Sequence, residues 1–460
     1  MDITFHGATR EVTGSCHVVR AGGSSVALDF GLFQGHRAEA NAKNLAVPFT
    51  PDELNAVVLS HAHIDHSGRL PLLARFGYDR PVYATSATRD LCAIMLADSA
   101  HIQQKDAEFL ARRKRSFVAP LYDQGDVARL MRRMVGMPYD RPFDVAPGIR
   151  ATFVEAGHIL GSASVVLDCS DSGVMRRLVY SGDIGRSGMP IIRDPRPPEG
   201  ADVVIMESTY GDRDHPPIAQ MPDRLGQIVR DTAARGGRVL IPAFAVGRSQ
   251  EILYDLHRLR RARAIPDIPI ILDSPLAIAA TSVFATNPDA FDRGEELVTS
   301  VEDLFDFERL EFARDATASK ALNERRGPMI IIAASGMAEA GRILHHLAYG
   351  APDPKNTILI VGFQAEHTLG RRIVERRPTL KVYGEDVPLR ANVEVLNGYS
   401  AHADRGELRR WLTAVRGSGS RNLAVHLVHG EPAAQDGLAE ILRGDGFEVS
   451  VPAWQSRHEF

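Results

Sequence analysis

The sequence predicts an α/β protein in which a region with a parallel sheet interrupts a β-rich region. Short β-rich runs fill about the first two hundred residues, and four strand–turn–helix units follow up to about residue 390. From about residue 391 the chain returns to its earlier pattern. With 460 residues, the chain is too long for one typical core. We therefore expect one domain over residues 1–208 and 391–460, and an inserted domain over residues 209–390.

The first part contains strand patterns bounded by Gly, Pro, Asp or Ser, which are typical turn residues. A long helical pattern at residues 86–113 lies between them. The strand patterns cover residues 24–31, 54–63, 80–87, 150–169, 176–185 and 201–208.

The middle part repeats one design, in which an apolar strand leads through a turn into an amphipathic helix. Near-continuous apolar strands are typical of a mostly parallel sheet that is covered by helices on both faces. The four units cover residues 238–261, 268–284, 328–350 and 356–376.

Composition narrows the class of protein. The net charge of −4 gives no bulk attraction to nucleic acid, so any such binding must use local basic patches. The three cysteines, Cys16, Cys92 and Cys169, form no CxxC pair, which argues against a disulfide framework and a thiolate zinc site. The N-terminus enters a strand pattern without a signal peptide, and no apolar stretch is long enough to span a bilayer. We expect a soluble, cytoplasmic protein with no membrane partner.

The segment HAHIDH places His61, His63, Asp65 and His66 directly after an apolar strand pattern. His61 and His63, two positions apart, can reach one ion, while Asp65 and His66 are turned toward a second. Imidazole and carboxylate together suit zinc, and manganese or iron is also compatible. The alternative is a solvated loop, but such a cluster is rare by chance.

Four ligands do not saturate two ions, so further ligands are expected at other strand ends. His158 in AGHILGSAS lies between glycines that permit tight turns. Asp183 in YSGDIG follows an apolar strand, and a carboxylate there can bridge two ions. His429 in LVHGE lies at the end of another strand, whereas its rival His426 lies within that strand and is worse placed to reach an ion.

HAHIDH, AGHILGS and SGDIG resemble the motifs of the metallo-β-lactamase superfamily. The resemblance implies an αββα sandwich with two zinc ions at one edge. It also implies that Asp29 in ALDFG orients the histidine loop. The long interruption between Asp183 and His429 resembles the β-CASP branch, whose members are nucleases that process RNA and DNA ends.

Further motifs resemble the same branch. MESTYG, YSAHAD and LVHGE resemble its motifs A, B and C, which implies roles for Glu207, His402 and His429. AFAVGRSQE, DSPLA and ASGM followed by GR match as well, so the resemblance covers nearly the whole chain. It is to bacterial and archaeal relatives of the cleavage and polyadenylation nuclease subunit, in which a motif C histidine accompanies RNA substrates. The chain departs from that family at His367 in AEHTLGR, where glycine is usual.

The resemblance also implies a mechanism in which two zinc ions hold a bridging hydroxide that attacks phosphorus. Asp65 would also steer that water, and His402, supported by Glu207, would protonate the leaving ribose oxygen. The ligands would be His61, His63 and His158 for one ion, Asp65, His66 and His429 for the other, and Asp183 between them.

Contacts to RNA are a separate expectation. The turns at Gly247–Arg248–Ser249 and at Ser335–Gly336 each open a helix and could offer N–H groups and an arginine to phosphates. Their alternative is a plain strand–helix turn. The basic run 112–115 and the arginine pairs 371–372 and 376–377 could follow an RNA backbone, or they are solvated helix faces.

These observations favour a zinc-dependent ribonuclease acting on RNA, most simply single-stranded RNA. The alternatives are a small-molecule hydrolase of the same superfamily, a DNA-directed β-CASP nuclease and a non-catalytic RNA-binding subunit. The Glu207–His402 pair and the inserted domain argue against the first alternative, and a full set of seven ligands argues against the last. A homodimer is compatible with the sequence, but no pattern specifies one, and endonuclease and 5′ exonuclease action stay open.

Overall fold

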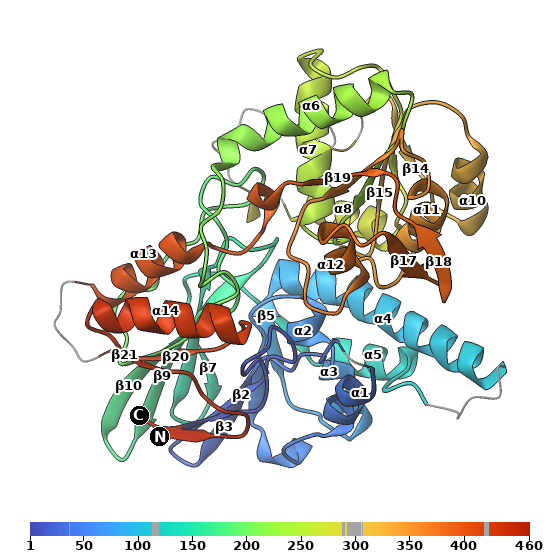
Figure 1. Ribbon diagram of the computed structural model, residues 1–460. Helices are drawn as coiled ribbons and strands as arrows, with labels where there is room; N and C mark the ends of the chain where they lie inside the picture. The colour runs from blue at the N-terminus through green and yellow to red at the C-terminus, as the bar shows by residue number, and fades with distance from the viewer. Residues whose placement is uncertain (36, 113–118, 288–289, 292–304, 306, 418–422) are drawn as a thin grey trace. The chain divides into compact units, whose positions relative to one another are not determined.

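A computed structural model describes the whole chain except residues 36, 113–118, 288–289, 292–304, 306 and 418–422 (Figure 1). The chain divides into two compact units. Unit 1 contains Met1–Ser187, Arg193–Asp214 and His402–Phe460, and unit 2 contains Gly188–Ile192 and His215–Ala401.

Unit 1 is built on two seven-stranded sheets. The first sheet has the order β22 (Arg457–Glu459), β1 (Asp2–Phe5), β2 (His17–Ala21), β3 (Ser24–Leu28), β4 (Ala56–Val58), β5 (Val82–Thr85) and β6 (Met134–Met137). The second has the order β21 (Glu448–Ser450), β20 (Ala424–Leu427), β11 (Val203–Met206), β10 (Val174–Tyr180), β9 (Ala163–Asp171), β8 (Ile149–Glu155) and β7 (Phe143–Ala146).

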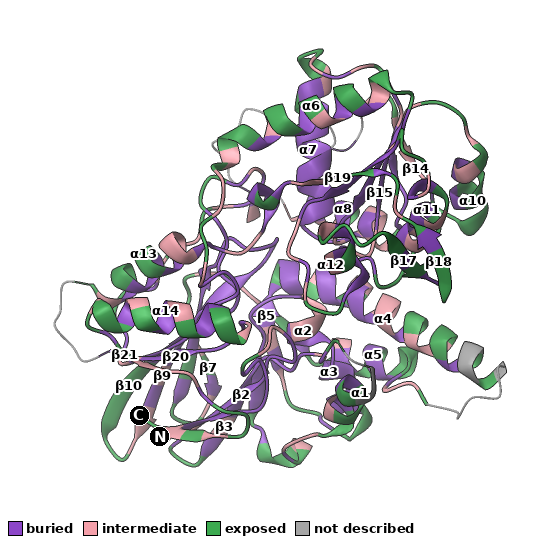
Figure 2. Ribbon diagram, in the orientation of Figure 1, coloured by how far each residue is buried: buried purple, intermediate pink, exposed green. Residues whose placement is uncertain are grey.

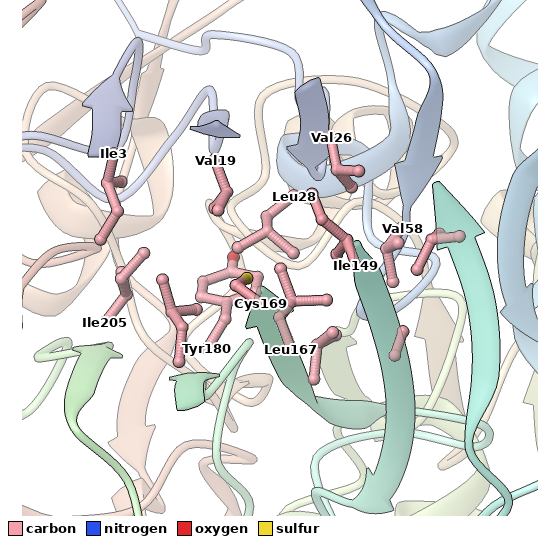
Figure 3. Packing of buried hydrophobic residues seen from close by; sticks show 14 of the residues in the cluster. Ile3, Val19, Val26, Leu28, Val58, Ile149, Leu167, Cys169, Tyr180 and Ile205 are labelled. Carbon is pink, nitrogen blue, oxygen red and sulfur yellow. The ribbon is translucent and has the colours of Figure 1, made fainter. Parts of the chain in front are cut away.

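The two sheets pack face to face through their apolar side chains, as Figure 3 shows. Val19 and Leu28 come from the first sheet, and Leu167 and Ile205 come from the second, all fully buried. Each such side chain stabilises the fold by about 1.5–3 kcal/mol relative to an exposed one. The outer sides of this sandwich carry the helices, so unit 1 is the αββα sandwich that the sequence predicted.

The helices of unit 1 form because their apolar residues lie on one face. In α13 the buried residues Leu408, Trp411, Leu412 and Val415 follow helical spacing and pack on the outer face of the second sheet together with α14. A capping box closes the start of α13, because the Asp404 carboxylate accepts the backbone N–H of residue 407. The helices are α1 (Arg37–Leu45), α2 (Ile64–Ser67), α3 (Leu70–Arg75), α4 (Ser86–Arg112), α5 (Gln124–Met131), α13 (Arg405–Arg416) and α14 (Pro432–Gly444).

Segments from both ends of the chain complete unit 1. Strand β22 pairs with β1, which brings the two termini together (Figure 1). Strand β20 pairs in parallel with β11, which pairs in parallel with β10. Because the carboxyl ends of parallel neighbours lie at the same edge of a sheet, the residues that follow β10, β11 and β20 meet there.

Unit 2 contains a six-stranded sheet in which every strand pairing is parallel, as predicted. All residues of β12, β15 and β16 are buried, so both faces of the sheet are covered (Figure 2). The strand order is β14 (Leu310–Phe312), β13 (Ile270–Leu272), β15 (Ile330–Ala333), β12 (Val239–Pro242), β16 (Thr357–Ile360) and β19 (Asn392–Val395).

Helices and a hairpin complete unit 2. Apolar residues of α10, α11 and α12 form one core with the sheet, and α7 packs against α6 and α8. The hairpin consists of β17 (Thr379–Val382) and β18 (Glu385–Pro388). The helices are α6 (Met221–Ala234), α7 (Arg248–Arg261), α8 (Pro275–Thr286), α10 (Ala316–Glu324), α11 (Ile343–Gly350) and α12 (Leu369–Val374).

The end of unit 2 differs from the boundary expected at residue 391. Strand β19 pairs with β16 in the sheet of unit 2, and the unit continues to Ala401. The apolar alternation of β19 fits either unit, because a strand pattern does not name its pairing partner.

Of the basic run at 112–115, residues 113–115 lie outside the described residues. Among the helices that the structure describes, none is both long and apolar enough to cross a membrane.

The backbone explains why glycine is usual at the position of His367. This exposed residue has φ of 67°, a left-handed conformation that disfavours residues with a Cβ. We expect His367→Gly to raise the free energy of unfolding by about 0.5–1 kcal/mol, measured by urea denaturation. His345→Gly, within the regular helix α11, serves as the control and should destabilise. Equal destabilisation by both substitutions would contradict this account.

Candidate metal centre

The histidine loop starts where β4 ends. Residues 59–63 lead from the strand into the one-turn helix α2, which carries Asp65 and His66. Backbone hydrogen bonds tie this helix to the segment after β3: Phe30 N–H donates to the His66 carbonyl, and Leu32 N–H donates to the Ile64 carbonyl. Gly31 permits this close approach, because a Cβ there would lie 1.5 Å from the Asp65 carbonyl oxygen.

The other predicted ligands lie at strand ends on the second sheet. Asp183 follows β10, and His429 follows β20 with a φ of 50°, a strained backbone of the kind found at functional sites. His158 lies in the loop between β8 and β9. There Gly157 adopts a φ of 65°, as the glycines in AGHILGS suggested. These residues therefore converge on the histidine loop from three separate connections.

One group of ligand atoms surrounds a side-chain oxygen of Asp183. His61 Nε2 and His158 Nε2 each lie 3.1 Å from His63 Nδ1. The Oδ2 atom of Asp183 is 3.4 Å from His61 Nε2 and 3.5 Å from His158 Nε2. All four potential ligand atoms lie within 4.8 Å of one another.

A second group surrounds the other oxygen of Asp183. His66 Nε2 lies 3.3 Å from Asp183 Oδ1 and 3.3 Å from His429 Nε2. His429 Nε2 is 3.5 Å from Asp65 Oδ2, and His429 Nδ1 is 3.5 Å from Asp183 Oδ1. The structure thus brings all seven predicted ligands together around Asp183. Potential ligand atoms of Glu207 and His402 also lie within 4.8 Å of those of Asp183 and His429, so this pair adjoins the predicted ligands.

The chemistry of these groups suits a divalent cation. Imidazole nitrogens face one another at 3.1–3.3 Å around carboxylate oxygens, so their lone pairs converge where a cation would compensate them. Burial lowers the pKa of His61 well below its usual range and lowers that of His63 to about 4, which favours the neutral imidazole that binds metal. Burial would raise the pKa of Asp183, but the surrounding histidines, His429 and His66 foremost, hold it well below its usual range.

Asp29 is fully buried beneath the histidine loop and forms three hydrogen bonds with it. Its carboxylate accepts the Ser60 N–H, the Ser60 hydroxyl and His66 Nδ1, each at 2.7 Å. The hydroxyl of Tyr180 donates to the same carboxylate at 2.7 Å. With Nδ1 held by Asp29, His66 keeps Nε2 for the ligand group.

Sequence reasoning missed three hydroxyl residues at the site: Tyr180, Ser60 and Thr209. The Thr209 hydroxyl lies 3.1 Å from His429 Nδ1. Their only sequence signal is adjacency, since Ser60 immediately precedes the histidine motif, Tyr180 precedes SGDIG, and Thr209 lies within MESTYG. Hydroxyl residues are too common in turns for such adjacency to identify them.

His402 and Glu207, 195 positions apart in the sequence, meet next to Asp183, with His402 Nδ1 3.9 Å from Asp183 Oδ2. His402 Nδ1 is 3.2 Å from both carboxylate oxygens of Glu207. Burial opposes the charged imidazole, but Glu207 and Asp183 outweigh it and raise the pKa of His402 to about 9. The side chain of His402 is 17% exposed, whereas that of Glu207 is fully buried.

The backbone holds this pair in place. Glu207 Oε1 accepts the backbone N–H of Ile184 at 2.6 Å, and the Ile184 carbonyl accepts the Ala403 N–H at 2.7 Å. Ile184, which follows Asp183 in the sequence, is thus bonded to Glu207 and to the residue after His402. The geometry fixes His402 relative to the carboxylates independently of any ion.

The remaining predicted residues lie elsewhere. His426 donates to or accepts from the Ser450 hydroxyl at 2.6 Å and packs on Phe5, away from both groups. In unit 2, Arg248 is buried and paired with Glu251, and the buried Ser249 donates to the Phe244 carbonyl. In this structure both side chains bond within unit 2, and their contact with phosphates stays a prediction.

The other predicted turn of unit 2 is also internally bonded. The hydroxyl of Ser335 accepts the backbone N–H groups of residues 339 and 340. Gly336 lies against the ring of Phe244, where a Cβ would be 2.6 Å from a ring carbon. Ser335 and Ser249 therefore lie on neighbouring loops of unit 2, both next to Phe244.

A pH-dependent contribution to stability arises at the base of the His158 loop. Burial raises the pKa of Glu155 to about 7, and its carboxylate accepts the Gly157 N–H at 3.0 Å. Because the folded-state pKa lies above the unfolded-state value near 4.5, the fold favours the neutral carboxyl; its contribution to stability is complete below pH 4.5 and is lost as pH rises through about 7 and the carboxylate forms in a buried site. The loss amounts to about 3 kcal/mol at 1.36 kcal/mol per pKa unit.

We therefore compare the free energy of unfolding of Glu155→Gln with that of the wild type. The difference, variant minus wild type, should be about 3 kcal/mol larger at pH 8.5 than at pH 4.5. Urea denaturation of both proteins in chelator at several pH values measures this difference, and titration of the shared histidines cancels. Glu199→Gln, on an exposed segment, is the control. A constant difference between Glu155→Gln and the wild type across this range would contradict the prediction.

An αββα sandwich with two adjoining His/Asp groups at the ends of its strands defines a metal-dependent hydrolase. Comparison with known families agrees. The metallo-beta-lactamase superfamily matches residues 9–218, the Beta-Casp domain matches residues 249–373, and the Zn-dependent metallo-hydrolase RNA specificity domain matches residues 386–452.

Similar proteins extend over nearly the whole chain. Ribonuclease TTHA0252 of Thermus thermophilus is 40% identical over 98% of this chain and 98% of its own length. Transcription termination factor FttA of Pyrococcus abyssi is 34% identical over 98% of this chain and 70% of its own length. A crystal structure of a protein of unknown function from Enterococcus faecalis shares the fold, with a TM-score of 0.54, 12% identity and 99% coverage of both chains.

The chain therefore belongs to the metallo-β-lactamase superfamily and, within it, to the β-CASP proteins.

Proposed function

We propose that the protein is a zinc-dependent ribonuclease that hydrolyses phosphodiester bonds of single-stranded RNA in the cytoplasm. The observation that carries this proposal is the Glu207–His402 pair beside the two ligand groups. A hydrolase of small lactams has no need for such a pair, whereas a ribose leaving group needs a proton donor. Two zinc ions bound there would supply an activated water and polarise a phosphoryl oxygen.

The predicted ligands would bind the two ions in two sets. His61, His63 and His158 would hold one ion, and Asp65, His66 and His429 would hold the other. Asp183, which lies between both groups, would contact both ions. Asp65 would also orient the attacking water. Asp29 would fix the ring of His66 through the bond to Nδ1.

His402 would then donate a proton to the departing ribose oxygen. Because Glu207 bonds to Nδ1, Nε2 is the nitrogen that remains for the substrate. Glu207 is anchored by the N–H groups of Ile184 and Thr209, so it positions the imidazole without moving itself. The side chain of His402 is partly exposed, which gives a substrate access to this proton.

The relatives support RNA as the substrate. The relative named a ribonuclease is 40% identical over 98% of its length, while the relatives named transcription termination factors are 30–34% identical over 66–70% of theirs. The matched RNA specificity domain at residues 386–452 contains His402 and His429. Ribonuclease action is therefore preferred, and self-association into a homodimer is to be measured alongside.

A substrate panel tests the proposal. The zinc-loaded protein is incubated with an end-labelled single-stranded RNA, the same sequence as DNA, and a lactam reporter. Cleavage of RNA, with little cleavage of DNA and no turnover of the reporter, is the expected result. Turnover of the reporter alone would favour a small-molecule hydrolase, and tight binding of intact RNA would favour a non-catalytic subunit. RNA carrying a 5′-phosphate or a 5′-hydroxyl separates exonuclease from endonuclease products.

A further inference from the structure

A cavity of about 550 Å³ opens on unit 2 at the end of helix α7, and it contains none of the residues assigned above. Its volume is in the range of pockets that bind small molecules. Three arginines, Arg260, Arg261 and Arg263, line it together with His257 and Phe307. Two carboxylates, those of Asp267 and Glu308, also reach its wall.

The carboxylates of the cavity are already paired. Asp267 lies 2.6 Å from Arg260 and 3.0 Å from Arg309, and Glu308 lies 3.4 Å from Arg260. Arg261 and Arg263 are exposed, and within the described part of the chain neither has an ion pair or a side-chain hydrogen bond. Two guanidinium groups therefore remain for an anionic ligand.

Helix stabilisation explains part of this arginine cluster but not all of it. Arg260 and Arg261 lie in the last turn of α7, where cations interact favourably with the helix dipole. Arg263 lies beyond the helix, with a φ of 53°, at the position where a closing turn usually has glycine. A residue with a Cβ strains the backbone there, yet this arginine adds a cation to the cavity wall.

An aromatic surface completes the cavity. The rings of His257 and Phe307 stack at 4.6 Å between centroids with 8° between their planes. Flat aromatic surfaces bind nucleobases by stacking and tolerate any base. Arginine forks next to such a surface fit a phosphate attached to a nucleoside.

We infer that this cavity binds the phosphate of a nucleotide through Arg261 and Arg263, with the His257–Phe307 stack facing the base or ribose. The inference rests on the proposed ribonuclease function, which supplies two sources of the same chemistry. One is a phosphodiester within bound RNA, and the other is a free mononucleotide released by cleavage. In the first case the cavity is a second contact for RNA outside the metal centre.

Binding measurements test the site. The test variant combines Arg261→Gln with Arg263→Gly, and the matched control is Arg258→Gln. Arg258 belongs to the same helix, α7, but is not among the residues that line the cavity. Its guanidinium carbon lies 5.7 Å from the centroid of the Tyr254 ring. All proteins are zinc-loaded and carry His402→Ala to prevent cleavage. The probes are a labelled single-stranded RNA and a labelled adenosine 5′-monophosphate, measured by fluorescence anisotropy.

We expect the double variant to lose about tenfold in affinity for at least one probe, and the control to lose less than about twofold. Loss for RNA alone identifies an internucleotide phosphate as the ligand, and loss for the mononucleotide identifies a product site. Unchanged affinity for both probes, or an equal loss in Arg258→Gln, would overturn the inference. Arg263→Gly relieves the left-handed strain, so the melting temperature should not fall; if the pair nevertheless fails to fold, Arg261→Gln is tested alone.

A second measurement separates this inference from the proposed function. The double variant with native His402 should hydrolyse bis(p-nitrophenyl) phosphate at the wild-type rate, because this small substrate does not need the cavity. If the wild type cleaves neither this ester nor RNA, the ribonuclease proposal fails, while the binding comparison still decides whether the cavity holds a nucleotide.

Discussion

Replacing Asp183 by asparagine is expected to remove bound metal from both ligand groups and to reduce RNA cleavage by more than about a thousandfold. Asp183 directs one oxygen to His61 and His158 and the other to His66 and His429. An amide keeps the shape of the side chain but loses its negative charge and one acceptor. Both groups therefore lose their shared anionic ligand at once.

Metal content measured by mass spectrometry after dialysis checks this result. His429→Gln should lose one ion, and His426→Gln is the matched control. Both histidines belong to the same short segment, but His426 contacts Ser450 and Phe5 instead of the ligand groups. Retention of two ions per chain in Asp183→Asn, or equal metal loss in His426→Gln, would show that the geometry has been assigned wrongly.

Much of the candidate site could be predicted because its residues fall in short segments after apolar strands. HAHIDH supplies four ligand atoms within one loop, and parallel strands bring Asp183 and His429 to the same edge. The Glu207–His402 pair is different, since local spacing cannot connect residues on two distant segments. Only the resemblance of their motifs to a known branch related them.

The hydroxyl residues were missed for a physical reason. Tyr180 and Ser60 bond to Asp29 and lie next to His66 and His61, so their importance depends on three-dimensional contacts. At Arg248 and Ser249 a glycine turn before a helix suggested phosphate binding, and this stays a prediction. Their burial against Glu251 and Phe244 depends on packing that a local pattern does not contain.

The fold was predictable where periodicity is strong. The inserted parallel sheet and its helices follow directly from apolar strands that alternate with amphipathic helices. Strand β22 has the polar sequence RHE, so nothing in its composition predicts that it pairs with β1. Strand β19 shows the same limit, because its pattern suits a strand of either unit.

Replacing His402 by alanine is expected to lower kcat for RNA by about 10²–10⁴-fold while the bound metal stays constant. The imidazole is held by Glu207, and six histidine and aspartate ligands besides Asp183 remain in the two groups. Glu207→Gln should lower kcat less, because the imidazole remains but loses its charged partner. Loss of metal in His402→Ala would instead make His402 a ligand.

Two substrates with different leaving groups distinguish proton donation by His402 from a role in positioning alone. Ribose oxygen leaves as a strongly basic alkoxide unless it is protonated, whereas p-nitrophenolate leaves readily without a proton. If His402 is the proton donor, His402→Ala should lose most of its activity on RNA but keep most of its activity on bis(p-nitrophenyl) phosphate. If both substrates slow equally, His402 positions the substrate or the ions, and the proton must come from elsewhere. The ratio of the two rates thus measures the chemical role of an imidazole that is held by Glu207 and is 17% exposed.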